Sequence, residues 1–280
     1  MPYILSHLSF ALPLGEALGC CTSSSRDLFA LGALGPDIYF FDRLPPTPFR
    51  PNQKRHGNRL HDTDCAVLAR AFLEQADESL LPYVYGFLTH IALDSTVHPY
   101  ICALYSGPDH TRFEGDIDAI FYERFRDRIP FASVLNTPKE LDALDALITS
   151  VSNATVSAGV PGAYARSLRK MLRLFPVLYD PRGKRFHAVA KAERLIGKDG
   201  VLSAFMLAAP RHYFEDCMND AHRVWHAETF PDVPRTESID ELFAEADALA
   251  RKLLRAAMDR DLETVCSLCA HRTMGAGPLP

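Results

Sequence analysis

The sequence has no excess of basic residues and no long uninterrupted apolar run. Its 280 residues include 30 Lys and Arg against 35 Asp and Glu, which gives a formal net charge of −5. Without a basic block, nothing supports a surface that binds duplex nucleic acid, although the composition does not exclude a small single-stranded nucleic acid as substrate. No apolar run approaches the ~20 residues that a bilayer-spanning helix needs, so we expect no transmembrane segment.

Positive charge is also missing from the start of the chain, and the cysteines do not form a dense pattern. The apolar segment 1–19 has the hydropathy of a signal peptide, but it has no basic start and carries His7 and Glu16. The seven cysteines are scattered, unlike the disulfide framework of a small secreted domain. We therefore expect a cytoplasmic protein with reduced thiols, with export through segment 1–19 as the alternative.

Alternating strand patterns are scarce, whereas helical periodicity recurs along the chain. Apolar residues at helical spacing predict helices over 62–76, 81–104, 111–128, 138–156, 163–178, 187–196 and 238–258. The last of these begins with a capping box of Ser238 and Glu241, and Thr137 is the expected N-cap of 138–156. We expect an all-α fold, with a single multi-helix domain over residues 1–260 and a short C-terminal helix and tail over 261–280.

Ionisable residues at four-residue spacing interrupt the apolar segment 85–101. His90, Asp94 and His98 are each four residues apart. On a helix, each step of four turns the side-chain direction by only about 40°, so all three project from one stripe. Burying three ionisable groups in a row is costly unless they are paired or bound to a metal. The stripe therefore indicates a metal site.

The same spacing recurs shortly afterwards, where His110, Glu114 and Asp118 follow one another. Two facing helices with such stripes can build a multinuclear site in the core of a bundle. Histidine with carboxylate suits zinc, with iron or manganese as alternatives. A single pair of this kind is more often a surface pair, and Asp118 alone also fits a solvated charge or a group that orients a ligating histidine.

Further candidates lie upstream of the two stripes. His7 lies in the apolar N-terminal segment, Asp37 follows a Gly-Pro turn, and His61 follows His56 by five residues. Taken singly, His7 is consistent with a core histidine and Asp37 with a helix N-cap. The proline-rich stretch 44–51 lies among these candidates, and we expect it to be a loop.

Taken together, the candidates occur in the order of a known family. The segments MPYILSH, GALGPD, GNRLHD, GFLTHIALDSTVHP and HTRFEGDID resemble the bacterial zinc-dependent phospholipase C family. The related fungal single-strand-specific zinc nucleases share this ligand order. The segment NDAHRVW resembles the C-terminal part of those members of the phospholipase C family that look cytoplasmic. The resemblance covers most of residues 1–255. It assigns eight candidate metal ligands, namely His7, Asp37, His61, His90, Asp94, His98, His110 and Glu114.

The resemblance implies two or three zinc ions. One ion would bind Asp37, His61, His90 and Asp94, and a second would bind His98, His110 and Glu114. A third would bind His7 and share Asp94. Secreted members start the mature chain with a tryptophan whose terminal amine binds metal. In those members the histidine that corresponds to His98 also follows the aspartate that corresponds to Asp94 by more than four residues. The sequence therefore does not decide the ligands of the third site or the geometry of the second. It also does not decide whether His56 replaces or assists His61.

The function implied by the resemblance is hydrolysis of phosphoric (di)esters by a zinc-activated water, with Asp37 as the general base. The substrate would be a small phosphoester or a phospholipid head group. Two alternatives remain: a non-catalytic helical protein that its metal stabilises, and a nuclease or nucleotide phosphodiesterase with the same cluster. A coordination position open to a cleft distinguishes a catalytic metal from a structural one.

Overall fold

The chain is mainly helical in the computed structural model, which describes residues 4–43, 53–197, 202–208 and 213–279. This confirms the all-α prediction, while the loop expected over 44–51 lies outside the described residues. The α-helices are α1 (Ile4–Leu18), α2 (Arg26–Leu34), α3 (Lys54–His61), α4 (Cys65–Gln75), α5 (Leu81–Leu104), α6 (Gly107–Phe125), α7 (Leu141–Val156), α8 (Ala163–Leu178), α9 (Lys184–Leu195), α10 (Ile239–Met258) and α11 (Leu262–Cys269). No described helix combines the length and apolar character needed to cross a bilayer.

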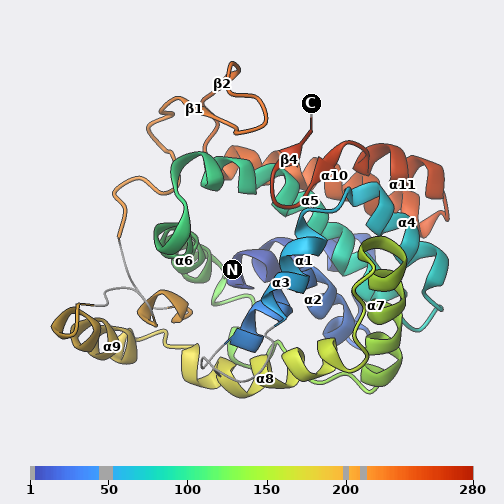
Figure 1. Cartoon of the computed structure of the whole chain (residues 1–280), viewed down its shortest axis with the longest axis horizontal. Coiled ribbons are helices and arrows are strands. Elements are labelled where there is room, and N and C mark those ends of the chain that lie inside the picture. The colour runs from blue at the N-terminus through green and yellow to red at the C-terminus, as the bar shows by residue number, and fades with distance from the viewer. Residues whose placement is uncertain (1–3, 44–52, 198–201, 209–212, 280) are drawn as a thin grey trace.

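Short elements complete the described part of the chain. Three 3₁₀ helices are η1 (Gly35–Arg43), η2 (Phe131–Ser133) and η3 (Ser203–Phe205). Two antiparallel strand pairs join β1 (Trp225–His226) to β2 (Pro234–Arg235) and β3 (Arg272–Thr273) to β4 (Gly277–Pro278). In Figure 1, α8 runs along one edge of the molecule and α10 and α11 along the opposite edge, with α1, α2, α3 and α5 between them.

The long helix α5 lies at the centre of the packing and carries one of the stripes of ionisable residues. Apolar residues of its first half belong to the largest hydrophobic core, and those of its second half pack into a second core with α6 and α10. The helix α2 crosses α5 closely at Gly86, where a Cβ would collide with the carbonyl oxygen of Phe29. The glycine therefore allows this close approach. Packing on several sides therefore fixes the direction of the polar residues that α5 carries.

The helix boundaries follow the local sequence signals in most places. α5 and α8 have the expected bounds, and the capping box of Ser238 and Glu241 is present at the start of α10. The expectation that Thr137 caps α7 is wrong. A turn in which Leu141 N donates to Pro138 O (3.3 Å) delays the helix, which begins at Leu141 after Glu140.

The residues after α11, expected to be a tail, form the β3–β4 hairpin, which packs against the central helix. Arg272 Nη1 donates to Ser95 Oγ on α5 (3.3 Å), and Gly275 N donates to His61 O at the end of α3 (3.1 Å). The last residues of the chain therefore reach the region in which the candidate ligands lie.

Candidate metal centre

Five candidate ligands from four elements lie together around Asp94, which is one of them. We call these residues the inner cluster: His7 on α1, Asp37 on η1, His61 on α3, and His90 and Asp94 on α5. Asp94 contacts three histidines, with Oδ1 at 3.2 Å from His7 Nε2 and Oδ2 at 3.3 Å from His90 Nε2 and 3.5 Å from His61 Nε2. Asp37 Oδ1 lies 3.1 Å from His61 Nε2, and Oδ2 lies 3.9 Å from His7 Nε2. All five side chains are buried.

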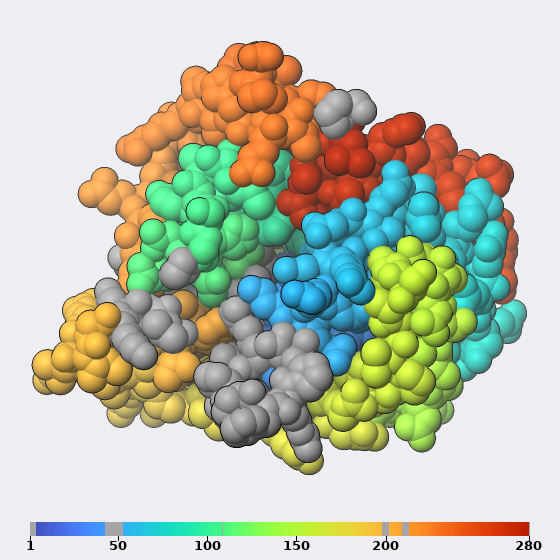
Figure 2. Space-filling model, in the orientation of Figure 1, coloured from blue at the N-terminus to red at the C-terminus, as the bar shows by residue number. Residues whose placement is uncertain are grey.

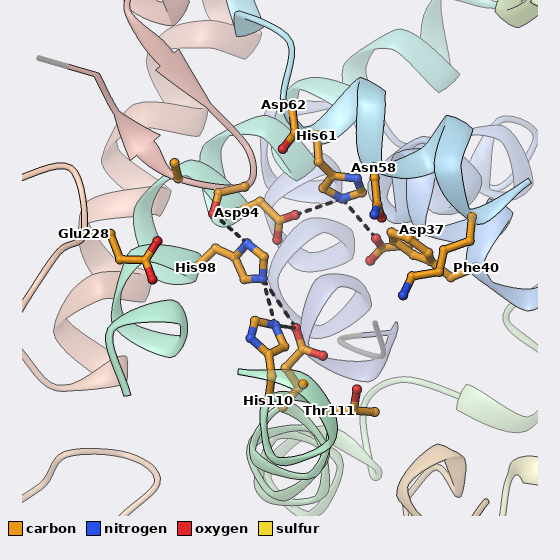
Figure 3. A pocket seen from close by; sticks show the side chains of 15 residues that line it. Asp37, Phe40, Asn58, His61, Asp62, Asp94, His98, His110, Thr111 and Glu228 are labelled. Atoms are coloured by element: carbon orange, nitrogen blue, oxygen red, sulfur yellow. Dashed lines mark hydrogen bonds and ion pairs between the residues drawn. The ribbon is translucent and has the colours of Figure 1, made fainter. Parts of the chain in front are cut away.

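The other three candidates, His98 on α5 and His110 and Glu114 on α6, meet one turn beyond Asp94. Together with Cys102 on α5, we call them the outer cluster. His98 Nε2 and His110 Nε2 are 3.1 Å apart (Figure 3). Glu114 Oε1 lies 3.0 Å from His110 Nε2 and 3.6 Å from His98 Nε2. Cys102 follows His98 by one helical turn, and one ligand atom from each of Cys102, His98 and His110 lies within 4.8 Å of the others. The structure thus brings the eight predicted residues into two neighbouring clusters.

Backbone carbonyl groups fix the orientation of four of the histidine rings. A carbonyl oxygen can only accept, so each Nδ1 that contacts one carries the hydrogen, and the Nε2 atom keeps its lone pair for the cluster. Such outer contacts are typical of metal-ligating histidines. The four pairs are His61 with Gly57 O (2.8 Å), His90 with Ala33 O (3.1 Å), His98 with Gly275 O (3.1 Å) and His110 with Tyr105 O (3.3 Å).

The facing Nε2 atoms of His98 and His110 need a cation or a proton between them. With hydrogen on both Nδ1 atoms, the two Nε2 lone pairs point at each other across 3.1 Å. His90 Nε2 shows a related feature, since it is fully buried and makes no hydrogen bond with the described residues although Asp94 Oδ2 is 3.3 Å away. Burying such an atom is costly unless it gains a hydrogen bond or binds an ion.

The spacing of the ligand atoms fits zinc. Zinc–nitrogen and zinc–oxygen bonds of ~2.0–2.1 Å in a tetrahedron place neighbouring ligand atoms about 3.3–3.4 Å apart. The contacts of Asp94 with the inner histidines span 3.2–3.5 Å, and those of Glu114 with the outer histidines span 3.0–3.6 Å. Imidazole and carboxylate are also the donors that zinc takes together.

Mutual attraction keeps the buried carboxylates ionised. Burial alone would raise the pKa of Asp94, but His90, His7 and His61 hold it well below its usual value. Burial likewise opposes ionisation of Asp37 and Glu114, yet His61 lowers the pKa of Asp37 and the charges around Glu114, His110 among them, hold its pKa well below the usual value. The carboxylates are therefore in the form that binds a metal ion.

The two histidines beside these carboxylates hold protons tightly while no metal is bound. Burial lowers the pKa of His61, but its hydrogen bonds to Asp37 and Asp94 outweigh burial and raise the pKa to about 10. Burial also lowers the pKa of His110, and Glu114 raises it to about 10. A metal ion must displace these protons, so metal binding is coupled to pH.

A glycine allows η1 to pass directly beside His90. Gly35 has a φ of +49°, and a Cβ there would lie 2.8 Å from ring carbons of His90. The chain can therefore turn at the end of α2 and place Asp37 in the inner cluster without displacing the histidine.

The sequence left the roles of His56 and Asp118 undecided, and the structure places both residues outside the two clusters. His56 Nε2 lies 3.1 Å from Ser152 Oγ, and its ring packs edge-on against Tyr39, so His61 is the histidine of α3 that lies in the inner cluster. Asp118 is 1% exposed and accepts from the backbone N–H groups of Leu5 (3.1 Å) and Ser6 (2.8 Å), at the start of α1.

A cavity of about 480 Å³ gives access to both clusters from solvent. On the face shown in Figure 2, the surface is hollowed between α6, α3 and the C-terminal residues. Its walls include Asp37, His61 and Asp94 of the inner cluster and His98, His110 and Glu114 of the outer cluster.

Several lining residues were not predicted from the sequence. They are Phe40, Lys54, Asn58, Asp62, Thr111 and Glu228. They come from η1, α3 and the residue after it, α6, and the loop between β1 and β2, and no spacing in the sequence connects them. Cys102 is different, because it extends the four-residue spacing of the α5 stripe and that signal was present.

Comparison with known protein families matches residues 1–158 to the family described as zinc dependent phospholipase C. The matched span is more than half of the 280 residues and contains both clusters. Curated proteins and solved structures gave no significant match.

Proposed function

Since the chain belongs to the zinc-dependent phospholipase C family, we propose that it is a hydrolase of phosphoric diesters that acts on a small phosphoester or a phospholipid head group. The observation that carries this proposal is the cavity of about 480 Å³ whose walls include ligand candidates from both clusters. A cavity of this size is typical of small-molecule sites. A metal that only braced the helices would need no such access.

The chain offers ligands for two or three zinc ions. The inner cluster would hold one ion through Asp37, His61, His90 and Asp94, and the outer cluster would hold a second through His98, His110 and Glu114. A third ion would bind His7 and share Asp94. When bound, zinc lowers the pKa of a water to ~7, neutralises phosphate charge and stabilises the leaving oxygen.

The charge of the cavity supports a role for metal in substrate binding. Among the described lining residues, five carboxylates face one lysine: Asp37, Asp62, Asp94, Glu114 and Glu228 against Lys54. A phosphate would be repelled by this wall. Two divalent cations with Lys54 add five positive charges, which balance the five carboxylates and make an anionic substrate acceptable.

Asp37 is the proposed general base. It lies in the cavity wall, 3.1 Å from His61, and the neighbouring histidine keeps it ionised. An ionised carboxylate at this place can accept a hydrogen bond from the attacking water and take its proton as the water attacks phosphorus. His61, anchored through Nδ1 to Gly57 O, keeps the carboxylate in position.

Metal content and phosphodiester hydrolysis, measured on the same purified sample, test this proposal. We expect at least two zinc ions per chain after growth with added zinc. We also expect hydrolysis of a bis-aryl phosphodiester that a chelator stops and zinc restores. Fewer than one ion per chain would contradict the metal centre. Two firmly bound ions without hydrolysis of the aryl diester, of phospholipid head groups or of nucleotides would favour a purely structural metal.

A further inference from the structure

The stripe of polar residues on α5 has a fourth member, Cys102. His90, Asp94, His98 and Cys102 follow one another at steps of four, so the thiol lies one turn beyond His98 and next to it on the helix surface. One ring nitrogen each of His98 and His110 lies within 4.8 Å of the sulfur and of the other. The thiol is thus part of a His-Cys-His group.

We propose that Cys102 is a thiolate ligand of the ion in the outer cluster, an assignment that rests on the proposed metal centre. The Nε2 atoms of His98 and His110 face each other across 3.1 Å, and a cation bound there would satisfy both lone pairs in place of a proton. A thiolate is a soft donor, and adding it to two imidazoles selects zinc, cadmium or cobalt over magnesium or manganese. With Glu114, the outer cluster then offers four protein ligands, the number that zinc takes in a tetrahedral site.

The surroundings of Cys102 are compatible with ligation. Its Sγ lies 3.8 Å from Gly275 O, the same carbonyl that accepts from His98 Nδ1. This long contact of a weak S–H donor is easily given up. On binding, the S–H bond breaks, the sulfur electron pair forms the metal–sulfur bond and the proton goes to solvent, so no oxidant or reductant is needed. Gly275 O keeps its bond to His98.

Cobalt substitution tests the assignment through a signal other than activity. Co²⁺ replaces zinc in His and Cys sites, and a thiolate bound to cobalt gives a charge-transfer band in the near ultraviolet. We would load the metal-free full-length protein with Co²⁺ and record absorption and cobalt content for wild type, Cys102→Ser and Cys266→Ser. Cys266 is the matched control, because it is also half-buried on a helix and its Sγ is directed to Ala66 O on α4 (4.0 Å).

The expected result is a charge-transfer band in wild type and in Cys266→Ser that is lost in Cys102→Ser. A wild type that binds two cobalt ions without this band overturns the assignment while leaving the proposed hydrolase intact. A band that survives in Cys102→Ser overturns it too. A wild type that binds no metal removes the hydrolase proposal and the assignment together.

A second measurement on unmutated protein covers the case in which Cys102→Ser fails to fold. Alkylation of each cysteine is followed by mass spectrometry in metal-free and zinc-loaded protein. Zinc is expected to slow alkylation of Cys102 and to leave that of Cys266 unchanged. Equal protection of both thiols, or none at Cys102 in protein that holds two zinc ions, contradicts ligation by Cys102.

Discussion

Asp118, in the middle of α6, accepts two hydrogen bonds from Ser6 at its Oδ1, one from the backbone N–H at 2.8 Å and one from the hydroxyl at 2.7 Å. The next residue, His7, belongs to the inner cluster. A buried carboxylate on α6 therefore holds the start of α1, where backbone N–H groups lack helical partners. Asp118 acts on the site by placing α1, whereas Asp94 lies within 3.5 Å of three histidines.

Replacing Asp94 with asparagine is expected to remove more metal than the same change at Asp118. Asp94 is shared between the proposed ions, so its loss removes a charged ligand from more than one of them. Asp118 supports the position of His7, and losses of supporting groups lower metal affinity by roughly 10- to 100-fold. Elemental analysis of both variants after identical purification measures the difference, and equal zinc contents would contradict this ranking.

Replacing Asp37 with asparagine is expected to suppress turnover while leaving the helical fold in place. Loss of a general base alone lowers the rate by about 10²- to 10⁴-fold. Asp37 comes from η1 and the amide has nearly the same shape, so changed packing is a poor alternative explanation. The kcat for a phosphodiester, with circular dichroism and zinc content of the same sample, measures the effect. Full activity would remove Asp37 from the reaction, and complete unfolding would favour a structural metal.

The stability gained from zinc is expected to grow as the pH rises from about 6.5 to about 9. In metal-free protein, the pKa of His61 is raised to about 10, above the usual 6.5. Its charged form therefore stabilises the metal-free fold fully below pH 6.5, and this contribution is lost as the pH rises towards 10. Zinc binds the neutral ring, so its affinity rises by about tenfold per pH unit for each proton displaced.

Thermal unfolding with zinc and with a chelator, at several pH values in this window, tests the prediction. The gap between the two melting temperatures should widen with pH, because the chelated form loses stability while zinc binding strengthens. His110, whose pKa is also raised to about 10, adds a second proton in the outer cluster. A gap that stays constant from pH 6.5 to pH 9 would contradict the proton displacement.

Part of the candidate site could be predicted because five of its eight ligand candidates follow helical spacing, whereas His7, Asp37 and His61 were assigned by the resemblance to a family. The steps of four on α5 and α6 place side chains on one face whatever the tertiary structure, and the order of the candidates matches a family that the comparison confirms over residues 1–158. The long apolar helix α5 was predicted with its observed bounds for a related reason. It is buried on nearly all sides, so polar residues within it stand out.

The missing parts of the site depend on contacts between distant segments. Gly275 O orients His98 from a position 177 residues further along the chain, and no local pattern signals such a carbonyl. The capping of α1 by Asp118 likewise joins residues 112 positions apart. Cys102 was missed for another reason, because the spacing was present but a cysteine in an apolar helix is usually a small hydrophobic residue.

Replacing Gly35 with alanine is expected to disturb the inner cluster without touching any ligand candidate. Gly35 has a φ of +49°, and a Cβ would lie 2.8 Å from ring carbons of His90, which is itself fixed by Ala33 O. A shift of the ring would separate His90 from Asp94, and a shift of η1 would move Asp37 out of the inner cluster. The substitution should therefore lower zinc content as well as stability.

Gly19→Ala provides the control that separates backbone strain from the collision with His90. Gly19 also has a positive φ, +76°, but a Cβ there meets nothing within 4 Å. An L-residue in this backbone region costs about 1–2 kcal/mol, so Gly19→Ala should lose about that much unfolding free energy and keep its zinc. Urea unfolding and elemental analysis of both variants measure the difference. If Gly35→Ala kept the zinc content of wild type and lost no more stability than Gly19→Ala, the close contact with His90 would have no role in holding the metal centre.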